Sequence, residues 1–96
     1  IRTLPPGGSI GTLTTLSNDA QSFTHYFNGV NDIIFYCGVD GRLYKHTVGV
    51  GESALSWPIS SMSCTGRSLI YDSGSDKLTF PYIQNNLVGI AEYLSP

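Results

Sequence analysis

The chain has 96 residues, which suits one domain, and 41% of them are hydrophobic, so the composition excludes a disordered chain. The formal net charge is -2, and only five Lys and Arg residues occur, scattered along the sequence. Nucleic-acid binding needs a concentrated basic patch, so we expect no nucleic-acid partner.

Length and composition also bear on assembly and location. A chain this short buries only about 60–65% of its unfolded surface, so we expect a homo-oligomer, either a dimer or a trimer. No apolar run approaches the roughly 20 residues of a membrane span, so we expect no membrane insertion. Charged residues make up 12% of the chain, against roughly 25% in an average soluble domain. This low charge and the many Ser, Thr and Gly residues favour a secreted or extracellular protein.

Strand signals are abundant along the chain, and helix signals are nearly absent. Short segments rich in Val, Ile, Thr, Tyr and Phe are separated by clusters of Gly, Asn, Asp or Ser. The expected strands are residues 9–16, 21–27, 32–38, 42–48, 54–62, 67–73, 77–83 and 86–94. Asp40 and Gly41 favour a tight turn, and Pro81, which lacks an N–H, favours an edge or a bulge for its strand. The sequence thus predicts a single all-β domain, residues 1–96, of about eight short antiparallel strands in a meander.

The two halves of the chain look like one unit used twice. A shift of 45 residues places Tyr26 on Tyr71 and brings the turn residues into phase with the strands. A rival shift of 35 reflects generic similarity between hairpins. We therefore expect two tandem four-stranded units, at about residues 10–50 and 54–95.

The expected strand 32–38 is apolar on both of its faces. Ile33, Phe35 and Cys37 alternate with Ile34 and Tyr36. A strand of this kind is covered on both sides, which one lone sheet cannot provide. The two units would therefore stack as a sandwich, or as propeller-like blades that need further copies to close a ring.

Cys37 and Cys64 are the only cysteines. They are too few for a disulfide-dense scaffold or, without both histidines, for a structural zinc site. One disulfide and two buried free thiols both remain open, and the thiols are slightly favoured.

Catalysis finds little support in the sequence. The two histidines, His25 and His46, are accompanied by no G-x-S-x-G motif. Asp40, Asp72 and Glu92 could supply a carboxylate pair for glycoside hydrolysis, but their positions are typical of turns and strand surfaces. We expect no enzymatic activity.

Metal and phosphate sites are also not expected. His25, His46 and Cys37 would be a minimal zinc set, but histidines on strand surfaces are commoner. The glycines of residues 5–12 lack the Lys-Ser/Thr pair of a phosphate-binding loop. We therefore expect no cofactor and no metal.

Carbohydrate binding fits the composition better. A sugar needs an aromatic ring against its C–H face and short hydrogen-bonding side chains, both held by loops and strand ends of a stiff scaffold. The chain has one Trp, six Tyr and four Phe, with Asp, Asn and Arg beside its turns. The candidate ligand-binding residues are Asp40, Arg42, Tyr44, His46, Trp57, Asn85 and Asn86.

Each candidate has a structural alternative. Trp57 is the largest ring for stacking, although a core position fits it slightly better. Arg42, Tyr44 and His46 share one strand face, which is either a sugar site or a solvated sheet surface. Asn85 and its neighbour Asn86 also suit a type I′ turn.

The segment Phe35–Thr47, FYCGVDGRLYKHT, resembles the hairpins of fungal and invertebrate propeller lectins, whose blades repeat every 45 residues or so. Some lectins of that type have two-blade chains that trimerise and bind fucose through an Arg–Glu–Trp set. Arg67 matches the Arg, but Thr79 or Phe80 stands where the Glu is expected, so the resemblance does not imply fucose.

In size, low charge and few cysteines the chain is also similar to small mushroom fruit-body lectins, including the α-galactosyl-binding Lyophyllum type. That resemblance implies a noncovalent dimer and a galactoside ligand.

The combined expectation is a non-enzymatic lectin that recognises a galactoside, favouring a terminal α-galactosyl group, on glycans or glycoconjugates. The main alternative is a protein-interaction or defence module, such as a hydrolase inhibitor or small toxin, with residues 38–42 as its contact loop. A third is a fragment of a larger propeller.

Overall fold

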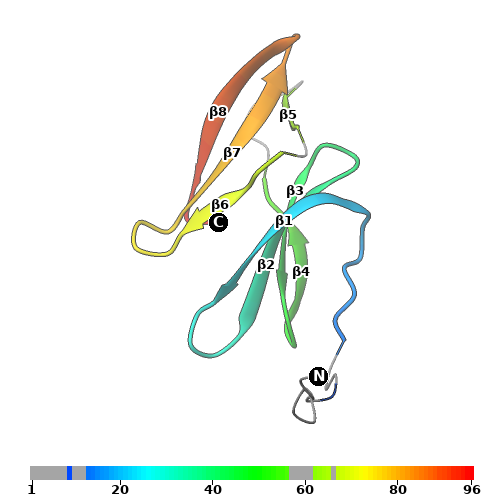
Figure 1. The fold of residues 1–96 in the computed structure, drawn as a ribbon, viewed down its shortest axis with the longest axis vertical. Helices are drawn as coiled ribbons and strands as arrows, with labels where there is room; N and C mark the ends of the chain where they lie inside the picture. Colours follow the sequence, from blue (N-terminus) through cyan, green and yellow to red (C-terminus); the bar gives the residue numbers. More distant parts are fainter. Residues whose placement is uncertain (1–8, 10–12, 57–61, 66) are drawn as a thin grey trace, which may run out of the picture.

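The structure, a computed structural model, describes residues 9, 13–56, 62–65 and 67–96. It is all-β, and its eight antiparallel strands form two sheets of four (Figure 1). The strands are β1 (Ala20–Phe27), β2 (Asp32–Gly38), β3 (Leu43–Thr47), β4 (Gly51–Ala54), β5 (Met62–Cys64), β6 (Ile70–Asp72), β7 (Lys77–Gln84) and β8 (Leu87–Leu94). In these ranges no helix is long and apolar enough to cross a membrane.

The first sheet is a meander in the order β1-β2-β3-β4. Its β2–β3 connection follows from turn chemistry: Gly41 N donates to Gly38 O (3.0 Å), and Gly38 N donates to Arg42 O (2.8 Å). Gly41 has a φ of +81°, the left-handed conformation that glycine adopts readily. The tight turn that the Asp40-Gly41 pair predicted is therefore present, and a glycine bulge closes it.

The second sheet is built around β7. β8 pairs with the whole of β7, whereas β5 pairs only with residues 82–84 and β6 only with residues 77–79. Because β8 occupies one edge of β7 throughout, β5 and β6 must share the other edge. The β7–β8 turn is formed by Asn85 and Asn86, whose φ values of +50° and +65° fit a type I′ turn.

Pro81 lies in the middle strand of this sheet, so the expectation of an edge or a bulge was wrong. Its carbonyl accepts a hydrogen bond from Thr65 N (3.2 Å), which shows that its backbone polar atoms face the β5–β6 side. Neither β5 nor β6 pairs with residue 81 in the register. The missing N–H therefore falls in the gap between these two short strands, where no ladder hydrogen bond is lost.

The core lies between the two sheets. It is formed by side chains that point inward from both: Ile33, Phe35, Cys37, Leu43, Cys64, Leu69, Leu78 and Phe80. Tyr71 joins the sheets by packing its ring 4.8 Å from that of Phe35 and 5.0 Å from that of Tyr26. Cys37 and Cys64 form a disulfide, so the slightly favoured expectation of free thiols was wrong. The sequence could not decide this, because the bridge depends on how the sheets stack.

Two strands of the first half differ from expectation. Residue 9 and residues 13–16 are not in a strand, because their alternation of Leu and Thr finds no partner among the described strands. The fourth strand of the first sheet is instead β4, in a segment expected to be a turn because of its two glycines, Gly49 and Gly51. The four residues of β4 pair with β3, from Gly51 opposite Thr47 to Ala54 opposite Tyr44.

The β1–β2 and β6–β7 pairings have the same register, displaced by 45 residues. The pairs Phe27–Asp32, Tyr26–Ile33 and His25–Ile34 correspond to Asp72–Lys77, Tyr71–Leu78 and Ile70–Thr79. The next hairpins differ by one residue, since Phe35 faces Lys45 whereas Phe80 faces Ala91.

Candidate functional site

The candidate site lies on the outer face of the first sheet, the face turned away from the second sheet. The pairing places Phe23, Tyr36, Tyr44 and Ala54 in one row across the four strands. The neighbouring row is His25, Ile34, His46 and Glu52. An aromatic row therefore runs beside a polar one.

Asp40 and Tyr44 are held together at the loop end of this face. The Tyr44 hydroxyl donates to Asp40 Oδ2 (2.5 Å), and the backbone N–H of Arg42 donates to Asp40 Oδ1 (3.0 Å). The Tyr44 hydrogen bond lowers the pKa of Asp40, and the same bond raises the pKa of Tyr44. Asp40 is therefore an ionised, exposed carboxylate in a fixed orientation.

Tyr36 and Tyr44 form the floor of the face. Their rings are stacked, with centroids 5.0 Å apart and planes 18° apart. Tyr36 is fully buried, and burial is the main reason that its pKa is raised to about 12. The alternation in the sequence placed Tyr36 on the face of β2 that points away from Phe35. The structure confirms that both faces of this strand are covered.

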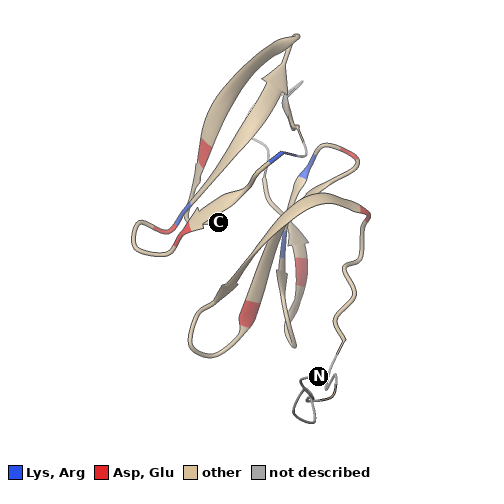
Figure 2. Ribbon diagram, in the orientation of Figure 1, with Lys and Arg blue, Asp and Glu red and all other residues tan. Residues whose placement is uncertain are grey.

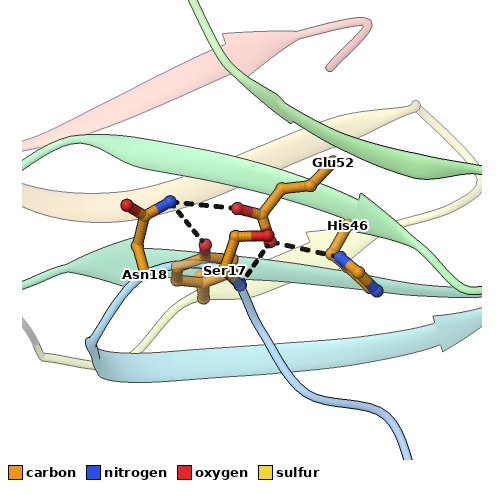
Figure 3. A network of polar contacts seen from close by, with 5 residues as sticks. Ser17, Asn18, His46 and Glu52 are labelled. Carbon is orange, nitrogen blue, oxygen red and sulfur yellow. Dashed lines mark hydrogen bonds and ion pairs between the residues drawn. The ribbon is translucent and has the colours of Figure 1, made fainter.

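Glu52 binds the segment before β1 and holds it against this face. Its carboxylate accepts hydrogen bonds from Asn18 Nδ2 (3.0 Å) and Ser17 N (3.3 Å), and His46 Nδ1 lies 3.1 Å away (Figure 3). Asn18 also donates to the Tyr36 hydroxyl (3.2 Å). We call Ser17, Asn18, His46 and Glu52 the clasp.

The electrostatics of the clasp favour an ionised Glu52. Burial by itself raises the pKa of this carboxyl, but hydrogen bonds from Tyr36, Ser17, His46 and Asn18 outweigh burial, and the net pKa is lowered. A carboxylate with so many donors is already satisfied. Glu52 therefore holds the segment before β1 in place and is not a free acceptor for a ligand.

The accessible part of the face lies beside the clasp and the loop. The Phe23 side chain is 67% exposed, and Arg42 is exposed as well. Gln21 Nε2 donates to the Gly38 carbonyl (2.9 Å), which fixes β1 against the loop. A side chain at Gly38 would meet Asp40 Oδ1 at 2.6 Å, so the absence of a side chain there leaves room for the carboxylate.

The structure brings only some of the predicted site residues together. Asp40, Arg42 and Tyr44 lie at one loop, and His46 lies on the same face but within the clasp. Asn85 and Asn86 form the turn at the far tip of the β7–β8 hairpin, away from that loop (Figure 1). Trp57 lies outside the described residues.

Sequence reasoning missed Ser17, Asn18, Tyr36 and Glu52 as members of the face. Glu52 was overlooked because its neighbours Gly49 and Gly51 suggested a turn, although it is in β4. The alternation that put Tyr36 opposite Phe35 was a usable signal. No local signal marks Ser17 or Asn18, since their partner lies more than 30 positions further along the chain.

The face offers four chemical groups to a ligand: the Asp40 carboxylate, the Phe23 ring, the Arg42 guanidinium and the Gln21 amide. Within the part of the chain that the structure describes, no group of three or more His, Cys, Asp or Glu residues could hold a metal ion. His25 and Asp32 form a separate, exposed pair with a distance of 2.7 Å between Nε2 and Oδ1. The arrangement suits recognition of a polar, partly apolar ligand.

The comparisons with known proteins found no match: no family model, no curated protein and no solved structure is similar to this chain.

Proposed function

We propose that the protein is a carbohydrate-binding lectin without enzymatic activity. The observation that carries the proposal is the fixed Asp40 carboxylate, oriented by Tyr44 and by the Arg42 backbone, on a face that exposes Phe23. A carboxylate accepts two hydrogen bonds from neighbouring sugar hydroxyls, and an exposed ring packs against a C–H face. Since these groups are already positioned, binding orders few side chains.

Galactosides are the ligands to test first, with terminal α-galactosyl glycans favoured. This choice rests on the resemblance to small mushroom lectins. His46, Trp57, Asn85 and Asn86 remain candidate contacts, the two asparagines as a separate site at the β7–β8 tip.

We also propose that the chain acts as a secreted homo-oligomer, a dimer or a trimer. Several weak sites in one assembly would raise the avidity for glycoconjugates. The shared 45-residue register of β1–β2 and β6–β7 supports an origin of the two sheets from one repeated unit.

The decisive experiment combines a glycan array with a titration of any glycan that binds. Asp40→Asn keeps the shape and one acceptor oxygen for the Arg42 N–H, but it removes the charge and the acceptor of the Tyr44 hydroxyl, so we expect roughly tenfold weaker binding. Asp76→Asn is the matched control, because Asp76 also accepts a hydrogen bond from a tyrosine, Tyr71 (2.6 Å), but on the other sheet.

A folded protein with no glycan above background would refute the lectin proposal. A positive array with Asp40→Asn unchanged would keep the lectin and reject this site.

A protein-interaction or defence module, such as a hydrolase inhibitor or small toxin, is the second candidate. The observation in its favour is the expected contact loop at residues 38–42, in which Val39 is 62% exposed. Inhibition of a hydrolase that added sugars do not relieve would favour it.

A further inference from the structure

The outer face of the second sheet is apolar and uncovered by the described chain. Residues pointing away from the core include Ile70, Ile83, Val88 and Ile90, which are 62%, 39%, 71% and 70% exposed. The pairs Ile83–Val88 and Pro81–Ile90 make the surface continuous across β7 and β8. Ile70 of β6 lies in the next row, opposite Thr79. We call Ile70, Pro81, Ile83, Val88 and Ile90 the outer patch.

The outer patch itself holds no charged residue, but charged residues border it at the end away from the turn: Glu92 shares a row with Ile70 and Thr79, and Asp72 and Lys77 form the next row. The charged residues of this hairpin are Lys77 and Glu92, which pair with each other (2.5 Å) toward the end away from the turn. Figure 2 shows no charge on the half of the hairpin near its tip. A ligand for this surface must therefore be apolar itself.

We propose that the outer patch is the interface of a twofold symmetric dimer of this chain, in which the second sheets of two copies pack face to face. The patch matches itself, being apolar and uncharged, and an isologous contact needs only one self-complementary surface. Face-to-face packing of sheets is also how the two sheets within the chain bury their core.

The area of the outer patch indicates how strong the dimer should be. Its exposed apolar area is on the order of 500 Å² per copy, against about 800 Å² per partner in interfaces of standard size. A dimer of micromolar affinity is therefore expected rather than an obligate one.

The outer face of the first sheet is the other surface that a copy could cover. That face carries the exposed pair His25–Asp32 and the clasp, and Ser17 and Asn18 already lie across it. Placing the outer patch there would take the exposed His25–Asp32 pair out of water and replace its solvent with apolar side chains, which is costly. The packing of like faces is the arrangement that the charges favour.

Sedimentation velocity over a range of concentrations tests the proposal. We expect a monomer–dimer equilibrium in the wild type and at least tenfold weaker dimerisation in Val88→Lys. Val30→Lys is the matched control, since Val30 is 80% exposed in the β1–β2 loop and far from the patch. Phe23→Lys, on the first sheet, should also leave dimerisation unchanged.

Three outcomes would overturn the proposal: a wild type that stays monomeric at millimolar concentration, a trimer, or a dimer that Val88→Lys does not weaken. A trimer weakened by Phe23→Lys would instead indicate head-to-tail packing of unlike faces. Circular dichroism checks the fold of each variant, and Ile90→Thr, a milder change in the same patch, replaces Val88→Lys if that variant fails to fold.

Discussion

At the scale of single residues, Gly41 and Gly49, two glycines of the first sheet's loops with left-handed conformations, differ in their surroundings. Gly41 (φ +81°) and Gly49 (φ +82°) have nearly the same backbone geometry. A side chain at Gly41 would lie 2.6 Å from the Cβ atom of Ser63, whereas one at Gly49 would meet nothing within 4 Å. Ser63 is in β5, so its Cβ atom cannot move without moving that strand.

The contrast predicts different costs for the same substitution. Gly49→Ala should lower the free energy of unfolding by about 1 kcal/mol, the cost of the left-handed conformation. Gly41→Ala should cost at least about 2 kcal/mol, because the added methyl group also collides with β5. Urea denaturation of both variants measures the difference. Equal losses would show that β5 does not press on the loop.

At the scale of the elements, the clasp fastens the chain before β1 across β2, β3 and β4. Ser17 and Asn18 are bound by Glu52 of β4, while His46 of β3 supports the same carboxylate (Figure 3). Because the clasp lowers the pKa of Glu52, folding and ionisation of this carboxyl are coupled.

The coupling predicts a loss of stability in acid. The folded state holds Glu52 ionised below its ordinary pKa of 4.5, so its contribution is complete above that value and is lost as the pH falls through the lowered pKa. Glu52→Gln should cost about 1–2 kcal/mol at pH 7, where one donor loses its acceptor. Its stability should also change less than that of the wild type between pH 6 and roughly pH 3. Thermal unfolding at each pH measures this. The same change of melting temperature with pH in both proteins would contradict this account.

At the scale of the whole molecule, the two sheets are joined by a shared core and by one covalent bond. The disulfide links Cys37 of β2 to Cys64 of β5, with a sequence separation of 27 residues and a Cα–Cα distance of 6.3 Å. Cys64 N also donates to Gly41 O (2.9 Å), so backbone and side chain tie the sheets at the same place.

The bridge should contribute a large share of the stability of so small a domain. Closing a loop of this length in the unfolded chain predicts a loss of about 3.5 kcal/mol when the bond is removed. A Cys37→Ala and Cys64→Ala double variant should therefore unfold at a lower urea concentration than the oxidised wild type. Reductant should destabilise the wild type and leave the double variant unchanged. A wild type indifferent to reductant would show that the core alone holds the sheets together.

The sequence by itself determined the features that depend on neighbours in the chain. The alternation in residues 32–38, the Asp40-Gly41 turn and the Asn85-Asn86 turn are local, because backbone conformation and strand faces follow from adjacent residues. The same local information correctly placed Tyr44 and His46 on one face. It wrongly predicted a strand at residue 9 and residues 13–16 and missed β4, because alternation alone does not supply a pairing partner.

Only the tertiary structure decided how distant segments meet. Glu52 binds Ser17 and Asn18 across separations of 35 and 34 residues, Cys37 reaches Cys64, and Pro81 fits the gap between β5 and β6. It also showed which face of the second sheet the described residues leave uncovered. These outcomes depend on the stacking of two complete sheets, which is set by the collective burial of the core rather than by any short stretch of sequence.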